Sequence, residues 1–427
     1  MTVQPTGNDS RQRIAVVGAG VSGLVAAWLL QDRFAVTLYE AEDRPGGHTN
    51  TCTVDDPAGP IPVDTGFIIY NEKNYPLFSR LLEEFGVAWQ PTDMSFSVRD
   101  DRSGLEWTGC NSPNAIFGQR RNLVNPAFWR MLADILRFGR EAPRVLDTVG
   151  DERSVHEFAR EHGYGDWFVE AYLLPMGASL WSCPMERFAE FPIRFVVEFM
   201  QHHALLQMAG RPQWRTIRGG SRTYVDALLA RFDGTLRLSS PIERARREGD
   251  SVNLTVNGVD EVHDEVVFAC HSDQVLALLA DADDDERRVL GAFPYQTNEA
   301  ILHCDTRVLP RARRCWAAWN HRRRTDHDGE RVAITYDMNI LQRLPAQRTW
   351  CVTLNDDADI DPALVARRIR YAHPLYTSER SAAQGRHAEM TRRRRSSFCG
   401  AYWGYGFHED GVRSAVAVAN AFGVDWP

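Results

Sequence analysis

The stretch Ile14-Ala15-Val16-Val17-Gly18-Ala19-Gly20-Val21-Ser22-Gly23 decides the fold. Its apolar half predicts a short strand, and its glycines have the Gly-x-Gly-x-x-Gly spacing that joins a strand to a helix in dinucleotide-binding folds. Gly18 permits the tight turn, Gly20 lets a pyrophosphate approach the main chain, and Gly23 lets the helix pack closely on the strand. The free N–H groups at the start of that helix favour a phosphate.

The residues that follow supply the rest of a strand–helix–strand unit. Residues 24–30 predict a packed helix, and residues 34–39, rich in β-branched and aromatic side chains, predict the second strand. Glu40 ends this strand about 20 positions after the glycines, where a carboxylate binds ribose hydroxyl groups. This context favours a bound dinucleotide over a purely structural glycine turn, but the glycines alone do not separate NAD from FAD.

Length and composition exclude several other classes of protein. A chain of 427 residues is long enough for two or three domains, and its net charge of −8 gives no support to nucleic-acid binding. The eight cysteines form no Cys-x-x-Cys pair, so we expect neither a metal site nor a redox dithiol. The sequence has no apolar leader and no run of about 18 apolar residues, which predicts a cytoplasmic protein without a spanning helix.

One compositional feature bears on the chemistry. Lys73 is the only lysine, and every other basic residue apart from histidine is arginine. Codon usage in a GC-rich genome is the simplest explanation. Any reaction that requires a lysine nevertheless has a single candidate in this chain.

A second cluster follows the first strand–helix–strand unit. Glu40 is followed by Arg44, Gly46, Gly47 and His48, and this run resembles the flavin amine oxidase and phytoene desaturase superfamily, whose pattern is an acid and then Arg-x-Gly-Gly. The resemblance implies FAD as the cofactor, with the arginine and paired glycines along its phosphates and ribityl chain. His48 departs from the pattern, because amine oxidases usually carry arginine there.

The resemblance extends along the chain in both directions from this cluster. Residues 63–67 resemble the family segment that passes close to the flavin ring, residues 241–242 resemble a segment beside the adenine, and residues 400–411 resemble the flavin loop before the last helix. The start of that helix would face the pyrophosphate or the flavin O2 edge. The cofactor-binding residues implied are Gly18, Gly20, Ser22, Gly23, Glu40, Arg44, Gly46, Gly47, His48, Thr65, Gly66, Phe67, Ile242, Gly406, Phe407, His408, Glu409 and Gly411.

Four stretches resemble a narrower group. Residues 64–71, 175–182, 336–339 and 406–411 look like a bacterial set of amine-oxidase-like FAD proteins that are often encoded beside cyclopropane fatty-acid synthase-type methyltransferases, and residues 371–374 also fit. Some members of this set are linked to desaturation of modified acyl chains. The resemblance implies a lipid substrate and a lipid methyltransferase partner, but analogy of fold constrains function only loosely.

The whole pattern predicts an α/β fold. We expect a Rossmann-type FAD-binding domain, similar to that of glutathione reductase, interleaved with a mixed α+β substrate-binding domain. The cofactor domain would comprise residues 1–85, 205–281 and 388–427, and the substrate domain residues 86–204 and 282–387.

The position of the only lysine bears on the type of reaction. Many amine oxidases of the superfamily place a lysine near the flavin N5 atom, but Lys73 precedes the position of that lysine by a long way. We therefore expect an FAD-dependent oxidoreductase that removes hydride from an apolar substrate, as a desaturase or isomerase of a lipid acyl chain. The alternatives are oxidation of an amine or an amino-acid-derived metabolite, and a non-catalytic flavin-binding partner of a lipid methyltransferase.

Other side chains carry weaker signals. The sequence identifies no catalytic acid or base, and His408, Glu409 and Asp410 are expected to cap the last helix rather than to transfer protons. Residues 128–146 form a basic amphipathic segment, for which packing in the core is favoured over peripheral contact with the inner face of the membrane. The candidates for the substrate pocket are Tyr70, Trp181, Tyr336 and Trp403, of which Tyr70, Tyr336 and Trp403 would form an aromatic wall at the flavin ring. Arginine clusters that could bind lipid headgroups are Arg311 with Arg313 and Arg314, Arg322 to Arg324, and Arg392 to Arg395.

Overall fold

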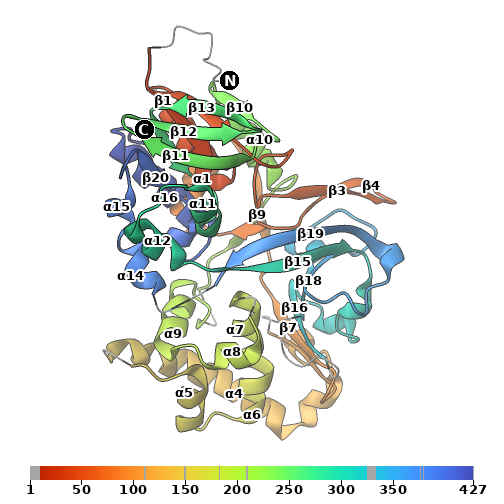
Figure 1. The fold of residues 1–427 in the computed structure, drawn as a ribbon. Helices are drawn as coiled ribbons and strands as arrows, with labels where there is room; N and C mark the ends of the chain where they lie inside the picture. Colours follow the sequence, from red (N-terminus) through yellow and green to blue (C-terminus); the bar gives the residue numbers. More distant parts are fainter. Residues whose placement is uncertain are drawn as a thin grey trace.

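The structure is a computed structural model, and it describes residues 10–109, 112–148, 151–181, 183–207, 210–324, 333–375, 377 and 379–426. Its upper part holds a sheet covered on both faces, its middle a large mixed sheet, and its lower part a layer of helices (Figure 1). This arrangement is the α/β fold that the sequence predicts, built around a Rossmann-type sheet.

The sheet of the upper part contains five parallel strands and includes the glycine motif. Along β1, Ile14 and Val16 point into the core on one face, whereas Ala15 and Val17 point into the core on the other. Because both faces are covered, the strand is apolar at every position rather than at alternate ones. The strand order is β10 (Thr235–Arg237), β2 (Ala35–Tyr39), β1 (Arg13–Val17), β14 (Glu265–Phe268) and β20 (Ser396–Phe398).

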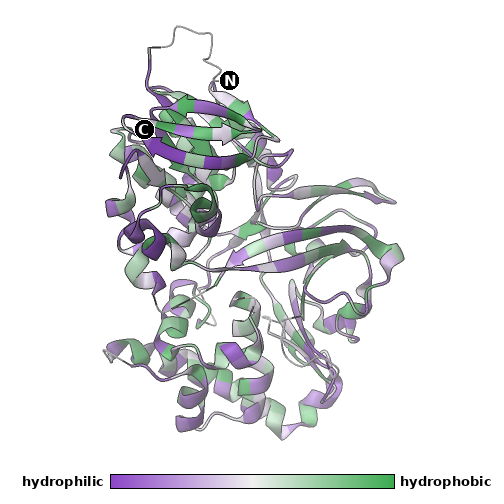
Figure 2. Cartoon of the chain, viewed as in Figure 1, coloured by the Kyte–Doolittle hydropathy of each residue, from purple (hydrophilic) through white to green (hydrophobic). Residues whose placement is uncertain are grey.

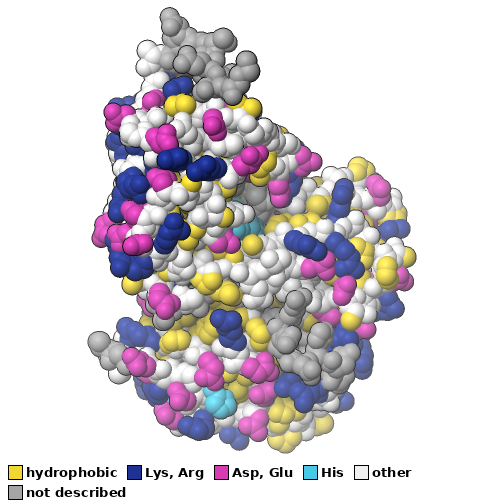
Figure 3. All heavy atoms as spheres, viewed as in Figure 1, with side chains coloured by type: hydrophobic (Ala, Val, Ile, Leu, Met, Phe, Trp, Pro, Cys, Tyr) yellow, Lys and Arg dark blue, Asp and Glu magenta, His cyan; other side chains and the backbone are white. Residues whose placement is uncertain are grey.

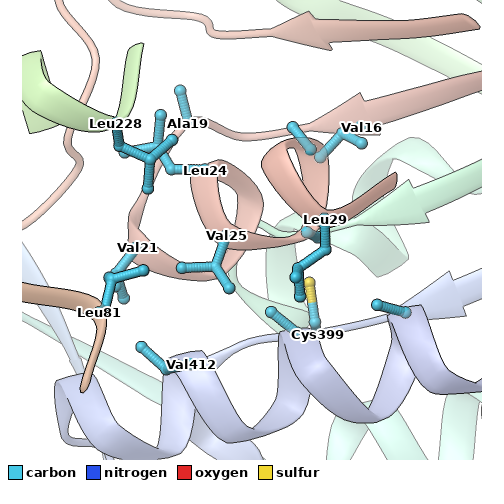
Figure 4. Packing of buried hydrophobic residues seen from close by; sticks show 14 of the residues in the cluster. Val16, Ala19, Val21, Leu24, Val25, Leu29, Leu81, Leu228, Cys399 and Val412 are labelled. Carbon is cyan, nitrogen blue, oxygen red and sulfur yellow. The ribbon is translucent and has the colours of Figure 1, made fainter. Parts of the chain in front are cut away.

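Helices from both ends of the sequence cover one face of this sheet. Val412 of the last helix packs beneath the first helix, in the same cluster as Val21 and Val25 (Figure 4). A Cβ atom added to Gly411 would lie 2.7 Å from Cγ1 of Val21, so only glycine allows the two helix starts to meet this closely. The helices on this face are α1 (Val21–Leu30), α2 (Pro76–Glu84), α10 (Arg222–Leu229) and α16 (His408–Ala421).

An antiparallel sheet of three strands and several short helices cover the opposite face. Hydrophobic and hydrophilic residues alternate along these strands, because one side of the sheet faces the core and the other faces solvent (Figure 2). The elements are β11 (Ile242–Glu248), β12 (Ser251–Val256), β13 (Val259–His263), α11 (Ser272–Leu278), α12 (Asp284–Gly291), α14 (Arg380–Gln384) and α15 (His387–Met390).

The packing on this face bears on the predicted division of the chain. Leu290 of α12, Ala383 of α14 and Met390 of α15 share a core with Val266 and Phe268 of β14. The predicted substrate-binding domain would include α12, α14 and the start of α15. Their packing instead places these helices with the five-stranded sheet. The division into two interleaved domains remains a prediction in its detail.

The middle of the molecule is a mixed sheet of seven strands. Only β16 and β7 run parallel to each other, and the remaining neighbours are antiparallel. Its order is β19 (Val365–Pro374), β15 (Tyr295–His303), β18 (Cys351–Leu354), β17 (Ala333–Asp337), β16 (Trp319–Arg323), β7 (Phe96–Asp100) and β8 (Leu105–Gly109). The hairpin of β3 (Thr51–Asp56) and β4 (Gly59–Asp64) packs on it, as does α13 (Met338–Leu341). A small sheet of β5 (Ile69–Tyr70), β9 (Trp214–Ile217) and β6 (Trp89–Thr92) connects this part to the upper one.

The lower layer consists of helices packed around phenylalanine side chains. Phe128 and Phe138 of α4 are buried in this layer together with Phe158 and Phe168. The amphipathic segment predicted at residues 128–146 therefore packs its apolar side into the protein, as the sequence favoured. The helices are α3 (Pro113–Ile116), α4 (Pro126–Glu141), α5 (Val155–Glu161), α6 (Asp166–Phe168), α7 (Leu174–Trp181), α8 (Met185–Ala189) and α9 (Ile193–His202).

Candidate cofactor and substrate site

The two glycine motifs of the sequence lie against each other. The N–H of Gly46 donates to the carbonyl of Ala19 at 2.8 Å, and Gly20 pairs with Gly46 in an isolated parallel bridge. A Cβ atom added to Gly47 would lie 3.3 Å from the Cα atom of Gly20. The loop after β2 therefore forms one wall of the space in front of α1.

The space in front of Gly20 fits a phosphate-bearing group. A Cβ atom added to Gly20 would meet no heavy atom within 4 Å, whereas one added to Gly23 would lie 1.8 Å from the carbonyl oxygen of Gly18. Gly23 is thus needed for packing within the protein, and Gly20 leaves open space beside the helix. No side-chain hydrogen bond caps the start of α1, whose residues all belong to the described chain. Uncapped N–H groups beside open space are the arrangement that binds a pyrophosphate.

Glu40 holds the main chain at the edge of this space. Its Oε2 atom accepts a hydrogen bond from the N–H of Ala19 at 2.8 Å, and its Oε1 atom accepts one from the N–H of Glu42 at 2.9 Å. A carboxylate has about four lone-pair sites, so a ribose hydroxyl can bind in addition to these two donors. Ile242 lies close by at the start of β11, because the N–H of Ser240 donates to the carbonyl of Glu40.

Arg44 braces the loop that carries the paired glycines. Its guanidinium donates to the carbonyl of Gly47 at 3.0 Å and pairs with the carboxylate of Glu42 at 2.9 Å. The side chain therefore has a structural role in shaping the loop, and a contact with a cofactor phosphate would add to it.

The segment after β4 meets the last helix at the expected flavin site. Gly66 approaches the main chain so closely that an added Cβ atom would lie 2.0 Å from the carbonyl oxygen of His48. The ring of Phe67 stacks on the imidazole of His408, with ring centroids 3.6 Å apart. The Nε2 atom of His408 lies 3.0 Å from the hydroxyl of Thr49, so the glycine loop also takes part. The structure thus brings together predicted residues from three distant segments.

The two carboxylates after His408 point away from this meeting point. The Oε2 atom of Glu409 accepts a hydrogen bond from the N–H of Phe78 at 3.0 Å, at the start of α2. The Oδ2 atom of Asp410 accepts one from the N–H of Phe407 and one from the N–H of Tyr405, each at 3.0 Å. Asp410 thus caps the last helix and holds the loop, as expected, whereas Glu409 caps α2 and the ring of His408 stacks on Phe67 instead of capping. Any contact of Glu409 with a cofactor would come from its main chain.

A group of aromatic side chains surrounds His48, and two of them, Tyr371 and His373, lie in the stretch 371–374 that resembles the narrower bacterial group. The imidazole of His48 stacks on the ring of Tyr371 at a centroid distance of 5.0 Å, and the rings of His271 and His373 lie within 5.6 Å and 5.5 Å of it. The hydroxyl of Tyr371 lies 2.8 Å from that of Thr65. Tyr371 and His373 are two positions apart on β19, so they share one face of the strand.

Burial keeps the histidines of the site uncharged at neutral pH. It lowers the pKa of His48 and of His271 to about 4, and that of His373 and of His408 to about 3. Proximity to His271 lowers the pKa of His48 further. Desolvation dominates each shift, because a charged imidazole is poorly stabilised away from water.

Phe407 connects the cofactor side of the site to the helical layer below. Its ring centroid lies 5.2 Å from that of His203, 6.0 Å from that of Phe199 and 6.3 Å from that of Tyr75. Burial lowers the pKa of His203 to about 4 and raises the pKa of Tyr75, so both are neutral at pH 7. The aromatic rings around Phe407 are therefore apolar or uncharged, whereas the carboxylate of Asp410 binds the main-chain N–H of Phe407 itself.

The four predicted pocket side chains lie in separate parts of the fold. Each packs in a different hydrophobic cluster, so Tyr70, Tyr336 and Trp403 do not form one aromatic wall. The aromatic partners are Phe78 for Tyr70, Phe188 for Trp181, Trp319 for Tyr336 and His387 for Trp403. Two of them connect to the site through a shared neighbour. Phe199 contacts the rings of Trp181 and Phe407, and Phe78 contacts the rings of Tyr70 and His408.

Lys73 lies on the surface. It is exposed in the turn between Tyr70 and α2. An exposed ammonium group stays hydrated and does not provide the buried amine of the usual amine oxidase site.

Comparison with known proteins agrees with this geometry. Residues 21–332 match the sequence profile of the family described as flavin containing amine oxidoreductase. An L-amino-acid oxidase from Mus musculus is 26% identical over 274 residues, which are 62% of this chain and 40% of the mouse protein. The chain therefore spans less than half the length of that relative.

Solved structures share the fold over nearly the whole chain. A cyclohexylamine oxidase from Brevibacterium oxydans superimposes with a TM-score of 0.66 at 15% identity, covering 97% of this chain and 100% of that one. A fatty acid isomerase from P. acnes that produces CLA superimposes with a TM-score of 0.64 at 17% identity, covering 98% of this chain and 100% of that one. At these identities the likeness concerns the fold alone.

Proposed function

We propose that this chain, which belongs to the flavin-containing amine oxidoreductase family and is an FAD-dependent oxidoreductase, removes a hydride from a lipid acyl chain. The product would be a desaturated or an isomerised chain. FAD is the cofactor of this family, and when bound it accepts a hydride at N5 and can return it.

The residues at the meeting of the glycine motifs would hold this cofactor. The N–H groups after Gly20 would bind the pyrophosphate, Glu40 the ribose, and the segment from Thr65 to Phe67 together with the start of α16 the flavin end. The open space at Gly20 supports this placement, because it is the one position of the motif where the protein leaves room beside the helix. The protein's part is to orient the cofactor and to exclude water.

The observation that carries the substrate proposal is that the rings around Phe407 are apolar or uncharged and that the nearby carboxylates are already engaged by main-chain N–H groups. His203 is neutral at pH 7, and the carboxylates of Glu409 and Asp410 bind main-chain N–H groups. An ammonium substrate needs a negative partner to replace its hydration, whereas an acyl chain needs only apolar contacts. The apolar helical layer beyond Phe199 supports such contacts.

The surface position of Lys73 supports the same proposal. A flavin amine oxidase of the usual kind relies on a buried lysine near the flavin, and this chain has only Lys73, which is exposed. Hydride removal from an acyl chain does not require that group. An isomerase in particular returns the hydride to its substrate and needs no external electron acceptor.

Oxidation of an amine or amino acid is the second candidate. The observation in its favour is the sequence similarity to the mouse L-amino-acid oxidase. It predicts that a small zwitterion or an amine, rather than an acyl chain, reduces the bound flavin.

Anaerobic reduction of the flavin separates these candidates. The purified holoprotein would be mixed with oleate, with phospholipid vesicles, with aliphatic amines and with L-amino acids, while the flavin absorbance is followed. Bleaching or a new double-bond isomer with acyl substrates alone supports the proposal, and bleaching with amines or amino acids alone replaces it with the second candidate. If none of these compounds is turned over, both enzyme proposals fail and a flavin-binding partner of a lipid methyltransferase is left.

A further inference from the structure

The lower face of the helical layer exposes an unusual concentration of hydrophobic side chains. Six large hydrophobic side chains are exposed among the described residues, and four of them lie between positions 123 and 136. The exposed fractions are 46% for Leu123, 85% for Val124, 51% for Trp129 and 49% for Leu136. Scattered surface hydrophobics are normal, but a contiguous group indicates a contact surface.

This group is rigidly held. Leu123 and Val124 belong to a 3-10 turn (Arg120–Val124) just before α4, and the indole N–H of Trp129 donates to the carbonyl of Leu123 at 2.9 Å. On its other side, α4 is anchored in the core by Phe128 and Phe138. Trp129 and Leu136 are seven positions apart, so they lie on the same outer face of the helix. The core-facing residues of α4 are thus distinct from the exposed ones.

Arginines surround the hydrophobic group. Arg120, Arg121 and Arg140 are exposed, and the guanidinium groups of Arg120 and Arg121 bind the main-chain carbonyls of Phe117 and Gly104. Neutral acceptors leave the positive charge of these groups uncompensated. Asp134 is the one acid between positions 120 and 140, and it is buried beside Arg130 and Arg137.

Two further arginines lie beside the same face. Arg313 and Arg314, with Ala312, line an open groove of about 400 Å³. The Cβ atom of Arg314 would lie 3.1 Å from a Cβ atom added to Gly118, which places the groove next to the segment that leads to the 3-10 turn. The carboxylate of Glu106 fixes the groove by accepting hydrogen bonds from the N–H groups of Arg311 and Ala312.

We propose that this face, formed by residues 120–124, the outer side of α4 and Arg313 with Arg314, docks the protein on the surface of an anionic lipid bilayer. Figure 3 shows hydrophobic side chains at the lower end of the molecule, among both basic and acidic ones, where Figure 1 draws α4. Leu123, Val124 and Trp129 enter the headgroup region, and the arginines contact lipid phosphates. The positive face contrasts with a chain whose net charge is −8, so the asymmetry orients the protein toward a negative surface.

A lipid surface fits this face better than a second copy of the chain. Two copies meeting face to face would oppose their arginines, and like charges across an interface are unfavourable. Aromatic and branched side chains flanked by arginine are the composition of interfacial membrane contacts. Among the described residues, no helix has the length and apolar character required to cross a bilayer.

Flotation with vesicles tests the proposal. The full-length holoprotein would be mixed with vesicles of pure phosphatidylcholine or of equal parts phosphatidylcholine and phosphatidylglycerol. We expect flotation with the anionic vesicles only, weakened by salt, because each basic residue at such a surface strengthens binding about fivefold. Failure to float with anionic vesicles at low salt would overturn the proposal.

Matched variants locate the contact. Val124→Asp should reduce binding about tenfold or more, since a charge replaces an inserted side chain, whereas Leu364→Asp changes an exposed leucine elsewhere and should not. The pair Arg120→Ser and Arg121→Ser should weaken binding, and the exposed pair Arg244→Ser and Arg246→Ser should not. Equal losses in the test and control variants would overturn the assignment of this face.

Two further measurements separate loss of membrane docking from loss of folding and from dimerisation. Because Val124 is largely exposed, its replacement should leave the melting temperature unchanged, which distinguishes lost docking from lost folding. A wild-type dimer in solution that Val124→Asp dissociates, without vesicle binding, would show a protein partner instead and refute the lipid surface. Vesicle flotation requires no turnover, so its outcome does not depend on the substrate proposed above.

Discussion

The carboxylate of Glu40 accepts a hydrogen bond from the main-chain N–H of Ala19 at 2.8 Å. This bond ties the end of the second strand to the turn between the glycines. Glu40 therefore shapes the cofactor site before any cofactor binds, in addition to its expected contact with a ribose.

Replacement of Glu40 by alanine should weaken both FAD retention and stability. Two main-chain N–H groups would lose their acceptor, which costs about 1–3 kcal/mol, and the ribose contact would be lost as well. The measurements are the flavin content after gel filtration and urea unfolding of the FAD-free protein. Asp43→Ala, at an exposed neighbour, serves as the control, and a Glu40→Ala protein that keeps its flavin at the wild-type level would refute the role.

Gly20 and Gly23 should respond to alanine in opposite ways. In Gly20→Ala the added methyl group points into open space, so the FAD-free protein should melt as the wild type does, while FAD affinity falls about tenfold or more. In Gly23→Ala the methyl group would lie 1.8 Å from the carbonyl oxygen of Gly18, and the protein should be strongly destabilised. Thermal melting and FAD titration separate the two effects. Normal FAD affinity in Gly20→Ala would place the pyrophosphate elsewhere.

Loss of the Glu409 side chain should loosen the contact between the last helix and α2. Glu409 is 3% exposed and caps the N–H groups of Leu77 and Phe78, so Glu409→Ala should lower the free energy of unfolding by about 1–2 kcal/mol. Urea unfolding measures the change, with the exposed Glu186→Ala as the control. If Glu409→Ala retains full stability but abolishes turnover, the residue is an acid or base rather than a cap.

Lys73→Met should leave the chemistry intact. The side chain is exposed, so its removal should change neither the fold nor the rate of anaerobic flavin reduction by more than about twofold. Stopped-flow absorbance with whichever substrate proves active measures this rate. A loss of reduction at unchanged FAD content would show that the surface turn reaches the flavin during the reaction.

Acid should destabilise the protein in a defined pH window. The pKa of the buried His321 is lowered by burial from 6.5 to about 4, so between these values the unfolded chain binds a proton that the folded chain does not. Stability should therefore fall as pH falls from about 6.5 to about 4, by on the order of 3 kcal/mol for one such histidine. His48, His271 and His303 shift in the same direction.

Melting temperatures across this pH range check the acid effect. His321→Asn removes one titrating group while retaining a polar partner for the hydroxyl of Ser179, so it should show a smaller fall than the wild type. Parallel pH profiles for the two proteins would mean that His321 titrates alike in the folded and unfolded states.

The sequence predicts well those parts of the fold whose signals are local. The run from β1 to β2 combines apolar strands with glycines whose spacing has one structural meaning. The structure forms both strands within one residue of the expected positions, and the helix begins three residues earlier than expected, at Val21. The pairing of the glycine loop with the loop at residues 400–411 came from resemblance, because no local rule relates segments so far apart.

The strands of the large sheet were mostly missed, for a physical reason. β19 pairs with β15 alone and lies at the edge of the sheet, so most of its side chains are exposed or half-buried and include Arg367, Arg368 and Arg370. An edge strand of this kind lacks the apolar alternation that identifies strands in a sequence. Tyr371 and His373 lie on this strand; the resemblance at residues 371–374 pointed to the stretch but not to its contact with His48.

The packing of Gly411 on Val21 and Ser22 has a consequence for the making of the protein. The ribosome synthesises α1 early. The helix that packs against its start, α16, is synthesised only after nearly all of the remaining chain. With the flavin placed as proposed, a growing chain cannot enclose it, and a messenger truncated before Gly411 should yield a colourless product. A yellow product would then indicate that translation had continued past Gly411.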